Sequence, residues 1–379
     1  MMQVYADHAA TTRVSQRALA AMQLCLNGYF GNPSSMSRPG RMSREVLDHA
    51  RARIASCLLC DAREVYFTSG GTEADAIAIQ TGVDVCLRTG KRHILTTAIE
   101  HHAVLNGMVH LAHEHGLALT CLDVSEDGIV SVPHFMNAIR PDTGFVSVMF
   151  ANNEIGTLQP IAEIAAFCRS EGILFHTDAV QAVGHIPIDL TGLDIDLLSA
   201  ASHKFYGPVG AGILYARHGL QPSRVYAGGM QERGVRSGTE NYPAIAGMAE
   251  ALVEATERMD ADMVHGNMLR DRLIDGLERL PGVTLNGDRR RRLPYHVNIC
   301  INDIDGEEML LYLDAHGIYA SMGAACMSGA AEKSHVLRAI GRSEKQIKSA
   351  IRLTLGRLNT LEDVAYILDV MREGIKKLL

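Results

Sequence analysis

The chain has 379 residues, of which 47% are hydrophobic and 21% are charged, and its formal net charge is -7 at pH 7. This length exceeds the usual size of a single hydrophobic core, so we expect a large domain and a smaller one. The composition excludes a disordered chain, and a mild negative charge without a dominant basic face argues against nucleic acid as an obligatory ligand.

The N-terminus and the cysteines indicate the cellular setting. Residues 1–10 contain Asp7 and His8 and lack the apolar core of a secretory signal, and no uninterrupted apolar stretch is long enough to span a bilayer. The eight cysteines are scattered along the chain, which favours reduced thiols over a disulfide framework. We therefore expect a cytoplasmic protein that has no membrane partner.

Apolar runs alternate with helical patterns along most of the chain. The expected strands are 64–68, 93–97, 117–122, 145–150, 174–176, 197–199 and 212–215. This alternation predicts an α/β fold with a mostly parallel seven-stranded sheet, covered on both faces, and with ligand groups at the carboxyl ends of its strands.

A change of pattern in the second half of the chain indicates the domain boundary. From about residue 244 a helical pattern runs to residue 280, and a different α+β pattern follows. We place the domain change within that helix. The large domain is then 13–255, and the smaller α+β domain consists of 1–12 and 256–379.

The segment Phe-Thr-Ser-Gly-Gly-Thr-Glu at 67–73 leaves an expected strand and enters a helix expected over 74–80. Free backbone N–H groups and the positive end of a helix suit a phosphate. Gly70 and Gly71 would let the backbone approach that phosphate, and Thr72 would add a hydroxyl. A plain turn with a helix cap has the same signature, so the segment alone leaves both readings open.

Ionisable groups follow two other expected strands. Asp178 and Gln181 come after one of them, and Ser202, His203 and Lys204 come after the next. A buried carboxylate suits a pyridinium nitrogen, and a lysine beside an anion site suits a Schiff base with an aldehyde cofactor. Taken alone, a lysine after a strand is more often a solvated residue, and it is the combination with the glycine turn that favours the functional reading of Lys204.

Cysteines in two places deserve a chemical reading. Cys326 lies among small residues in Met-Gly-Ala-Ala-Cys-Met-Ser-Gly-Ala-Ala at 322–331, where little packing is available, so we expect a mobile loop whose thiol can approach and leave a substrate. A structural cysteine is the alternative. Cys57 and Cys60 have Cys-x-x-Cys spacing, but no second pair or histidine follows at zinc-site spacing, so we expect them to serve packing.

An ordered set of motifs along nearly the whole chain resembles the cysteine desulfurases of the NifS/IscS type, which are class V aminotransferase-like enzymes of pyridoxal-phosphate (PLP) fold type I. The motifs are Tyr-Ala-Asp-His-Ala-Ala-Thr-Thr at 5–12, Gly-Asn-Pro-Ser-Ser at 31–35, the segment 68–73, Glu-His at 100–101, Asn-Asn-Glu-Ile-Gly at 152–156, His-Thr-Asp-Ala at 176–179, Ser-His-Lys at 202–204, Gly-Met-Gln-Glu-Arg-Gly at 229–234, Arg-Ser-Gly-Thr at 236–239, Gly-Ala-Ala-Cys at 323–326 and Ser-His-Val-Leu-Arg at 334–338. The loop around Cys326 resembles the NifS/IscS branch and not the SufS branch.

The resemblance implies a cofactor, pyridoxal 5'-phosphate, and a set of residues around its ring. Lys204 would hold the cofactor as a Schiff base, and Asp178 would pair with the pyridine nitrogen. Gln181 and Asn153 would form hydrogen bonds around the ring oxygen. His101 would stack on the ring and help to move protons, although without the family match a core or surface histidine would be the better reading.

The resemblance also implies how the phosphate is held. Gly71, Thr72, Ser202 and His203 would line it, and Thr239 would reach the phosphate of the other subunit in a homodimer. In this chain Ala201 stands where these enzymes commonly have a serine on the phosphate, Ser202 stands where they have a small residue, and Ala76 replaces a frequent asparagine. We hypothesise that Ser202 or a backbone shift compensates.

The reaction implied by the resemblance starts from L-cysteine, whose carboxylate Arg352 would bind with help from Asn153. Lys204 would remove the α-proton, and Cys326 would take the sulfur as a persulfide and pass it to a sulfur-acceptor protein, such as an iron–sulfur scaffold or another thiocofactor system. Two alternatives stay open. One is a different class V PLP enzyme, a selenocysteine lyase or an aminotransferase, and the other is a catalytically silent sulfur carrier or scaffold.

Overall fold

The computed structural model describes residues 2–322 and 333–379. The helices are α1 (Gln16–Gly28), α2 (Arg38–Leu58), α3 (Gly71–Thr89), α4 (His102–His115), α5 (Val132–Ala138), α6 (Ile161–Ser170), α7 (Tyr242–Leu277), α8 (Gly306–Ala315), α9 (His335–Ala339), α10 (Glu344–Lys348) and α11 (Leu361–Leu378), with short 3-10 turns η1 (Ala62–Glu64), η2 (Ser202–Lys204) and η3 (Gln231–Gly234). The strands are β1 (Val4–Tyr5), β2 (Val65–Thr68), β3 (His93–Thr97), β4 (Ala118–Leu122), β5 (Thr143–Ser147), β6 (Leu174–Asp178), β7 (Leu197–Ala201), β8 (Gly212–Ala216), β9 (Val283–Leu285), β10 (His296–Ile301), β11 (Ile318–Tyr319) and β12 (Ala350–Thr354).

The main sheet has seven strands in the order β2-β8-β7-β6-β5-β3-β4. Only β8 runs antiparallel to its neighbours β2 and β7, and all other neighbouring pairs are parallel. The predicted α/β fold with a mostly parallel sheet is therefore confirmed, and each expected strand is present within a few residues of its expected bounds. The helix expected from residue 74 begins earlier, at Gly71, directly after the glycine turn.

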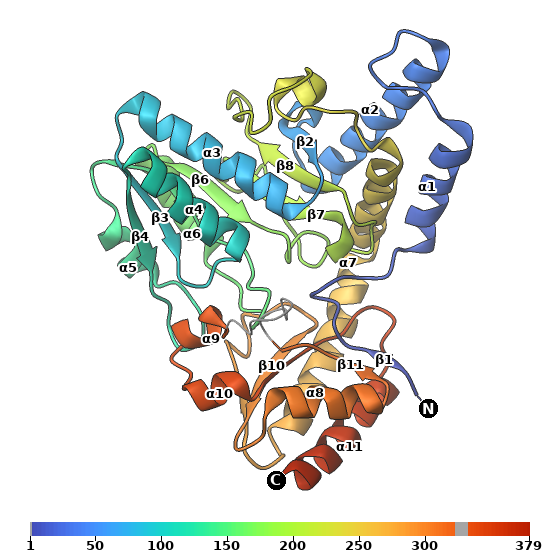
Figure 1. The fold of residues 1–379 in the computed structure, drawn as a ribbon, viewed down its shortest axis with the longest axis vertical. Coiled ribbons are helices and arrows are strands. Elements are labelled where there is room, and N and C mark those ends of the chain that lie inside the picture. Colours follow the sequence, from blue (N-terminus) through green and yellow to red (C-terminus); the bar gives the residue numbers. More distant parts are fainter. Residues whose placement is uncertain (1, 323–332) are drawn as a thin grey trace.

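Alternating side chains of the central strands enter two separate cores, one on each face of the sheet. Ile94 and Phe145 pack with residues of α3 and α4. Leu95 and Val146, the next residue on each strand, pack with α1, α2, α6 and α7. Because successive side chains of a strand point to opposite faces, a strand that is buried on both sides carries apolar residues at successive positions, as Ile94-Leu95 and Phe145-Val146 do. Figure 1 shows α3 and α4 lying over one face of the sheet.

A second group of elements lies below the main sheet in Figure 1 and contains both chain termini. Its three-stranded antiparallel sheet has the order β12-β10-β9, and β1 pairs in parallel with β11 beside it. Helices α8 and α11 cover a third core that includes Leu313, Val297 and Ile367. The N-terminal strand therefore packs with elements formed from the end of the chain.

Helix α7 connects the two groups without a break. Its N-terminal part, including Met248 and Leu252, packs in the core with α1 and α2, and its C-terminal part, including Leu269 and Leu273, packs in the third core. The boundary at residue 255 stays a prediction, because one continuous helix serves both cores. Within residues 2–322 and 333–379, no helix combines the length and the apolar character needed to cross a membrane.

The contact between α3 and β5 gives a test of the packing. A Cβ atom at Gly82 would lie 2.3 Å from Cγ of Phe145, a ring that is itself fully buried. We expect Gly82→Ala to lower the free energy of unfolding by about 1–3 kcal/mol, because a packed core cannot take up the extra methyl group without strain. Gly28→Ala, at the end of α1 with nothing within 4 Å of the new Cβ, is the control and should lose no stability. Equal urea midpoints for both variants would contradict this account of the packing.

Candidate active site

The carboxyl ends of β6 and β7 bring two ionisable side chains to one edge of the main sheet. Asp178 is the last residue of β6 and is 5% exposed, and its Oδ1 accepts a hydrogen bond of 2.9 Å from the N–H of Val180. Lys204 lies in η2, directly after β7. Since β6 and β7 are parallel neighbours, groups that follow them meet at the same edge.

The Lys204 amine is held by the N-terminal segment of the chain. Its Nζ donates hydrogen bonds to the carbonyl oxygens of Ala9, at 2.6 Å, and Ala10, at 2.8 Å. Burial and, to a smaller extent, the positive charge of Arg352 lower the pKa of Lys204 to about 8, against the opposing charges of Asp178 and Asp7. A lysine in this state is half neutral near pH 8, and the neutral amine is the form that reacts with an aldehyde.

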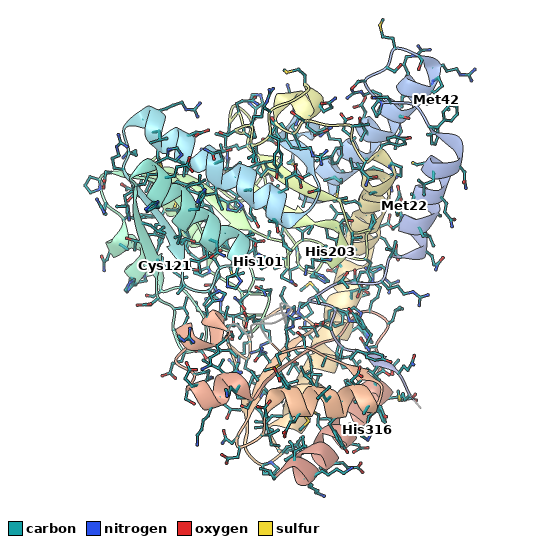
Figure 2. All side chains as sticks on the ribbon, in the orientation of Figure 1. Met22, Met42, His101, Cys121, His203 and His316 are labelled. Atoms are coloured by element: carbon teal, nitrogen blue, oxygen red, sulfur yellow. The ribbon has the colours of Figure 1, made fainter. Side chains whose placement is uncertain are left out.

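Gln181 and His203 are brought to the same N-terminal segment. Gln181 donates a 3.0 Å hydrogen bond to the carbonyl oxygen of Ala9. His203 Nδ1 lies 3.2 Å from the hydroxyl of Thr11, and the hydroxyl of Thr12 donates to the carbonyl oxygen of His203 at 2.8 Å. Figure 2 shows His203 and His101 on the edge of the main sheet that faces the second group of elements.

The turn before α3 lies against the ends of β6 and β7. No side chain caps the N-terminus of α3. A Cβ atom at Gly71 would lie 2.7 Å from Cγ2 of Val180 and 3.7 Å from Cβ of Ala201, so only glycine lets the backbone approach this closely. Thr72 follows in the first turn and is exposed. Free N–H groups and an exposed hydroxyl at a helix N-terminus form a site for an anion such as a phosphate.

His101 approaches Asp178 from the N-terminus of α4. It caps that helix, with Nδ1 accepting a 3.2 Å hydrogen bond from the N–H of Ala103, so the proton of the neutral ring lies on Nε2. The ring keeps solvent exposure, yet desolvation by the surrounding protein lowers its pKa, against the opposing charge of Asp178. One polar atom each of His101, Asp178 and Asp75 lie within 4.8 Å of one another.

Arg352, on β12, contributes the guanidinium group of the site. Its Nη2 donates to Oδ1 of Asp7 at 2.6 Å, its Nη1 donates to the carbonyl oxygen of Asn153 at 3.0 Å, and its buried Nε has no hydrogen-bond partner among the described residues. The structure thus brings Arg352 and Asn153 together, at the boundary between the main sheet and the second group of elements.

Ser202 is placed differently from the expectation. Its buried hydroxyl has no hydrogen-bond partner among the described residues and lies on the side of Gly207 and Ala251, whereas the side chain of Ala201 faces Gly71. Residues 201 and 202 therefore point in opposite directions at the end of β7, and the hydroxyl is not among the groups brought to the phosphate turn.

Two other predicted site residues are not placed at this edge by the described part of the chain. Thr239 is exposed and forms no hydrogen bond within the described part of the chain. Cys326 lies outside the described residues. Cys57 and Cys60, by contrast, are half-buried and pack against the main core. Burial raises the pKa of Cys60 to about 12, so it is a thiol at neutral pH.

Two buried carboxyl groups near Asp178 escaped the sequence reasoning. Asp75 lies in α3 and is 1% exposed. Glu100 is fully buried, where it accepts hydrogen bonds from the hydroxyl of Thr97 and the N–H of Met149, and burial raises its pKa to about 8. The signal for Asp75 was a lone acid in the otherwise apolar run Ala-Asp-Ala-Ile-Ala-Ile at 74–79.

A lysine and a buried carboxyl group at the ends of adjacent parallel strands, opposite a glycine turn at a helix N-terminus, define the fold type I class of PLP enzymes. The chain belongs to the aminotransferase class-V family, whose sequence model matches residues 4–367.

Named relatives and solved structures agree with this assignment. A curated relative from Methanosarcina thermophila, named cysteine desulfurase IscS, is 47% identical over 375 residues, which cover 99% of this chain and 92% of the relative. A solved structure named NifS-like protein superposes with a TM-score of 0.92 at 36% identity and covers 100% of both chains. A structure titled SspA in complex with cysteine has a TM-score of 0.82 at 31% identity and covers 94% of this chain and 100% of that one.

The residues present fit PLP, the cofactor of this family. The close approach of Gly71 and the uncapped N-terminus of α3 suit the phosphate, and the buried Asp178 carboxyl group suits the ring nitrogen. Lys204, with its lowered pKa, suits the aldehyde carbon.

The lowered pKa of Lys204 predicts how PLP attaches to the apoprotein. The neutral fraction of the amine rises as the pH rises through about 8, so the rate of attachment should rise with a midpoint near that value. Arg352→Gln should move the midpoint to higher pH, because it removes a positive charge that disfavours the charged amine. The measurement is the growth of visible absorbance after PLP is added.

Arg290→Gln, at an exposed arginine whose charge is not among those that shift the pKa of Lys204, is the matched control and should leave this midpoint unchanged. A midpoint that stays in place in the Arg352 variant would contradict the electrostatic account of the Lys204 amine.

Proposed function

We infer that this protein is a PLP-dependent cysteine desulfurase, which converts L-cysteine to L-alanine and takes the sulfur as a persulfide on Cys326. The observation that carries the inference is the meeting of Lys204, Asp178 and Arg352 at one edge of the main sheet. Those three groups suit a Schiff base, a ring nitrogen and an amino-acid carboxylate. The relatives at 41–47% identity over 99% of this chain carry the same activity in their names.

Lys204 has the chemistry of the residue that moves the α-proton. When bound, the cofactor supplies an electron sink that acidifies the α-carbon of the amino acid. The free Lys204 amine, whose pKa burial lowers to about 8, would be able to accept a proton near neutral pH. The carbonyl groups of Ala9 and Ala10 hold that amine at the edge of the sheet.

Arg352 is suited to hold the carboxylate of the substrate. Two of its nitrogens are fixed by Asp7 and by the carbonyl oxygen of Asn153, which sets the plane of the guanidinium, and within residues 2–322 and 333–379 Nε has no hydrogen-bond partner. A fixed guanidinium forms directional hydrogen bonds with a carboxylate, which orient the α-carbon relative to Lys204.

The described residues on both sides of Cys326 are tied to this site. Ser321 exchanges backbone hydrogen bonds of 3.2 and 2.7 Å with Arg352. On the other side, Ser334 donates to Glu154 at 2.5 Å, and His335 Nε2 lies 2.8 Å from the carbonyl oxygen of Glu100. Cys326 follows Ser321 by five residues, and a chain of that length spans at most about 17 Å when extended. The loop that carries Cys326 therefore begins beside Arg352, the residue suited to the substrate carboxylate.

The sulfur transfer balances without a further reactant. The Cys326 thiolate attacks the sulfur of cysteine, an S–S bond forms as the C–S bond breaks, and the electron pair of that bond stays with carbon. The carbon then takes a proton and becomes the methyl group of alanine. Cys326 is left as a persulfide, which thiol–disulfide chemistry can pass to a sulfur-acceptor protein for iron–sulfur clusters or another thiocofactor.

Replacing the thiol separates cofactor binding from sulfur transfer. Cys326→Ala should keep the visible absorbance of bound PLP and lose alanine formation from L-cysteine, because Lys204 is intact while the sulfur acceptor is missing. Cys121→Ala is the control. The Cys121 residue is exposed, but desolvation by the surrounding protein raises the pKa of its thiol to about 11, so it is a thiol at neutral pH and its loss should leave turnover unchanged. The measurement is alanine released per hour.

Unchanged alanine formation in the Cys326 variant would remove the persulfide assignment. Keto-acid products in place of alanine would indicate an aminotransferase, and strong preference for selenocysteine would indicate a selenocysteine lyase. A purified protein that stays colourless with PLP would indicate a silent scaffold.

We also propose that the protein is a homodimer in which Thr239 reaches the phosphate site of the partner subunit. A surface hollow beside the phosphate turn is lined by Glu73, Tyr226 and Arg236, and Thr239 follows on the same exposed segment. Large apolar side chains of this surface are exposed, Tyr226 at 56% and Met230 at 73%. An exposed apolar rim next to an incomplete phosphate site suits a second copy of the chain.

Mixing two variants tests the shared site. Thr239→Val and Lys204→Ala should each give homodimers with weak PLP binding or no turnover. Mixed dimers contain one site with both an intact Lys204 and an intact Thr239, so activity should return on mixing and subunit exchange. No return of activity in dimers that have exchanged subunits, or a monomer in sedimentation, would contradict the proposal.

The proposed setting is the cytoplasm, where a persulfide cysteine starts from a reduced thiol. The seven cysteines of the described residues are all unpaired, which agrees with a reducing compartment.

A further inference from the structure

A buried polar chain runs behind Asp178 and ends at Asp75. The hydroxyl of Ser147 lies 2.8 Å from Nδ1 of His176, and Nε2 of His176 lies 3.0 Å from the hydroxyl of Ser199. Oδ1 of Asp75 lies 3.7 Å from the same Nε2 and has no hydrogen-bond partner among the described residues. All four side chains are at most 1% exposed.

Asp75 is also close to the carboxyl group that is suited to the cofactor ring. Its carboxyl oxygen lies within 4.8 Å of a carboxyl oxygen of Asp178. Two carboxylates this close inside a protein cannot both be ionised at low cost, because their charges repel and neither is solvated. One proton must therefore stay on the pair at neutral pH.

The surroundings decide which carboxyl group keeps that proton. Asp178 faces groups that favour its ionised form, namely His101, the N–H of Val180 and Lys204. Among the residues that the structure describes, no lysine or arginine contributes to the pKa shift of Asp75. His176 from β6 is neutral, because burial lowers its pKa to about 3. His101 from α4 also has a polar atom within 4.8 Å of the Asp75 carboxyl group, and desolvation lowers its pKa as well. The other ionisable neighbours of Asp75 are the acids Asp178 and Glu100.

The pKa shifts agree with this division. Burial raises the pKa of Asp75 well above its usual range, the charge of Asp178 raises it further, and only a hydrogen bond from Ser199 opposes the shift. Burial also raises the pKa of Asp178, but three neighbouring groups oppose it there.

We propose that Asp75 is a positioning residue which stays protonated beside Asp178 and leaves Asp178 as the single negative charge for the ring nitrogen of the cofactor. A neutral Asp75 carboxyl group adds no second negative charge within 4.8 Å of Asp178. The assignment of the ring nitrogen to Asp178 rests on the proposed function, whereas the protonation of Asp75 does not.

Infrared spectroscopy of the apoprotein tests the protonation directly. At pH 7 the wild type should show the carbonyl stretch of a protonated carboxylic acid that Asp75→Asn removes. Glu100→Gln is the matched control, because Glu100 is the neighbouring buried acid with a raised pKa, and it should remove a different component of the band. Loss of no component in the Asp75 variant would overturn the proposal, whatever the enzyme proves to catalyse.

The visible absorbance of bound PLP tests the positioning role. Asp75→Asn keeps a neutral donor of the same shape, so PLP affinity should change by less than about twofold and the pH midpoint of the absorbance should stay in place. Asp75→Leu removes the polar group beside Asp178, so PLP affinity should fall by about tenfold and the midpoint should move, because a carboxylate in a buried site is sensitive to the loss of a nearby dipole.

Two results would overturn the proposal. A midpoint displaced by about one pH unit or more in Asp75→Asn would mean that the wild-type residue is ionised. A midpoint and affinity unchanged in a folded Asp75→Leu would mean that Asp75 has no part in the cofactor site. A protein that binds PLP as described but does not desulfurate cysteine would contradict the proposed function alone.

Discussion

The rest of the site depends on the contacts that the N-terminal segment makes with Lys204 and Arg352. Lys204 is held by the carbonyl oxygens of Ala9 and Ala10, and Arg352 is paired with Asp7 in the same segment. The ends of the parallel strands supply the lysine, and the second group of elements supplies the arginine. A few residues of extended chain between them fix how far apart the two cations lie, and so where an amino acid can fit between them.

Burial, more than ion pairing, sets the charges of this region. It lowers the pKa of Lys204 and of His176 and raises that of Glu100, so several groups that are charged in water are neutral or nearly so here. Because these groups are neutral or nearly so, few charged side chains remain at this edge of the sheet. The remaining charges of Arg352 and Asp178 then act over short distances with little competition.

The fold and much of the site could be predicted because both follow from local patterns. Strand periodicity gave the main sheet, and the rule that ligands gather at the carboxyl ends of parallel strands grouped Asp178 with Lys204. The direction of the Ser202 hydroxyl could not be predicted, since it depends on the 3-10 turn that follows β7. The role of Asp75 could not be predicted either, because the neighbours of an acid on a helix depend on how that helix packs against the sheet.

The pairing of β1 with β11, and of Asp7 with Arg352, joins the first residues of the chain to nearly the last. Contacts of such long sequence separation form late, because the whole intervening chain must be ordered first. During synthesis the main sheet can fold around its own cores before β12 has left the ribosome. The pairing of Asp7 with Arg352 can form only after that. The site proposed for the substrate carboxylate therefore forms only after β12 has been synthesised, even where the main sheet has folded earlier.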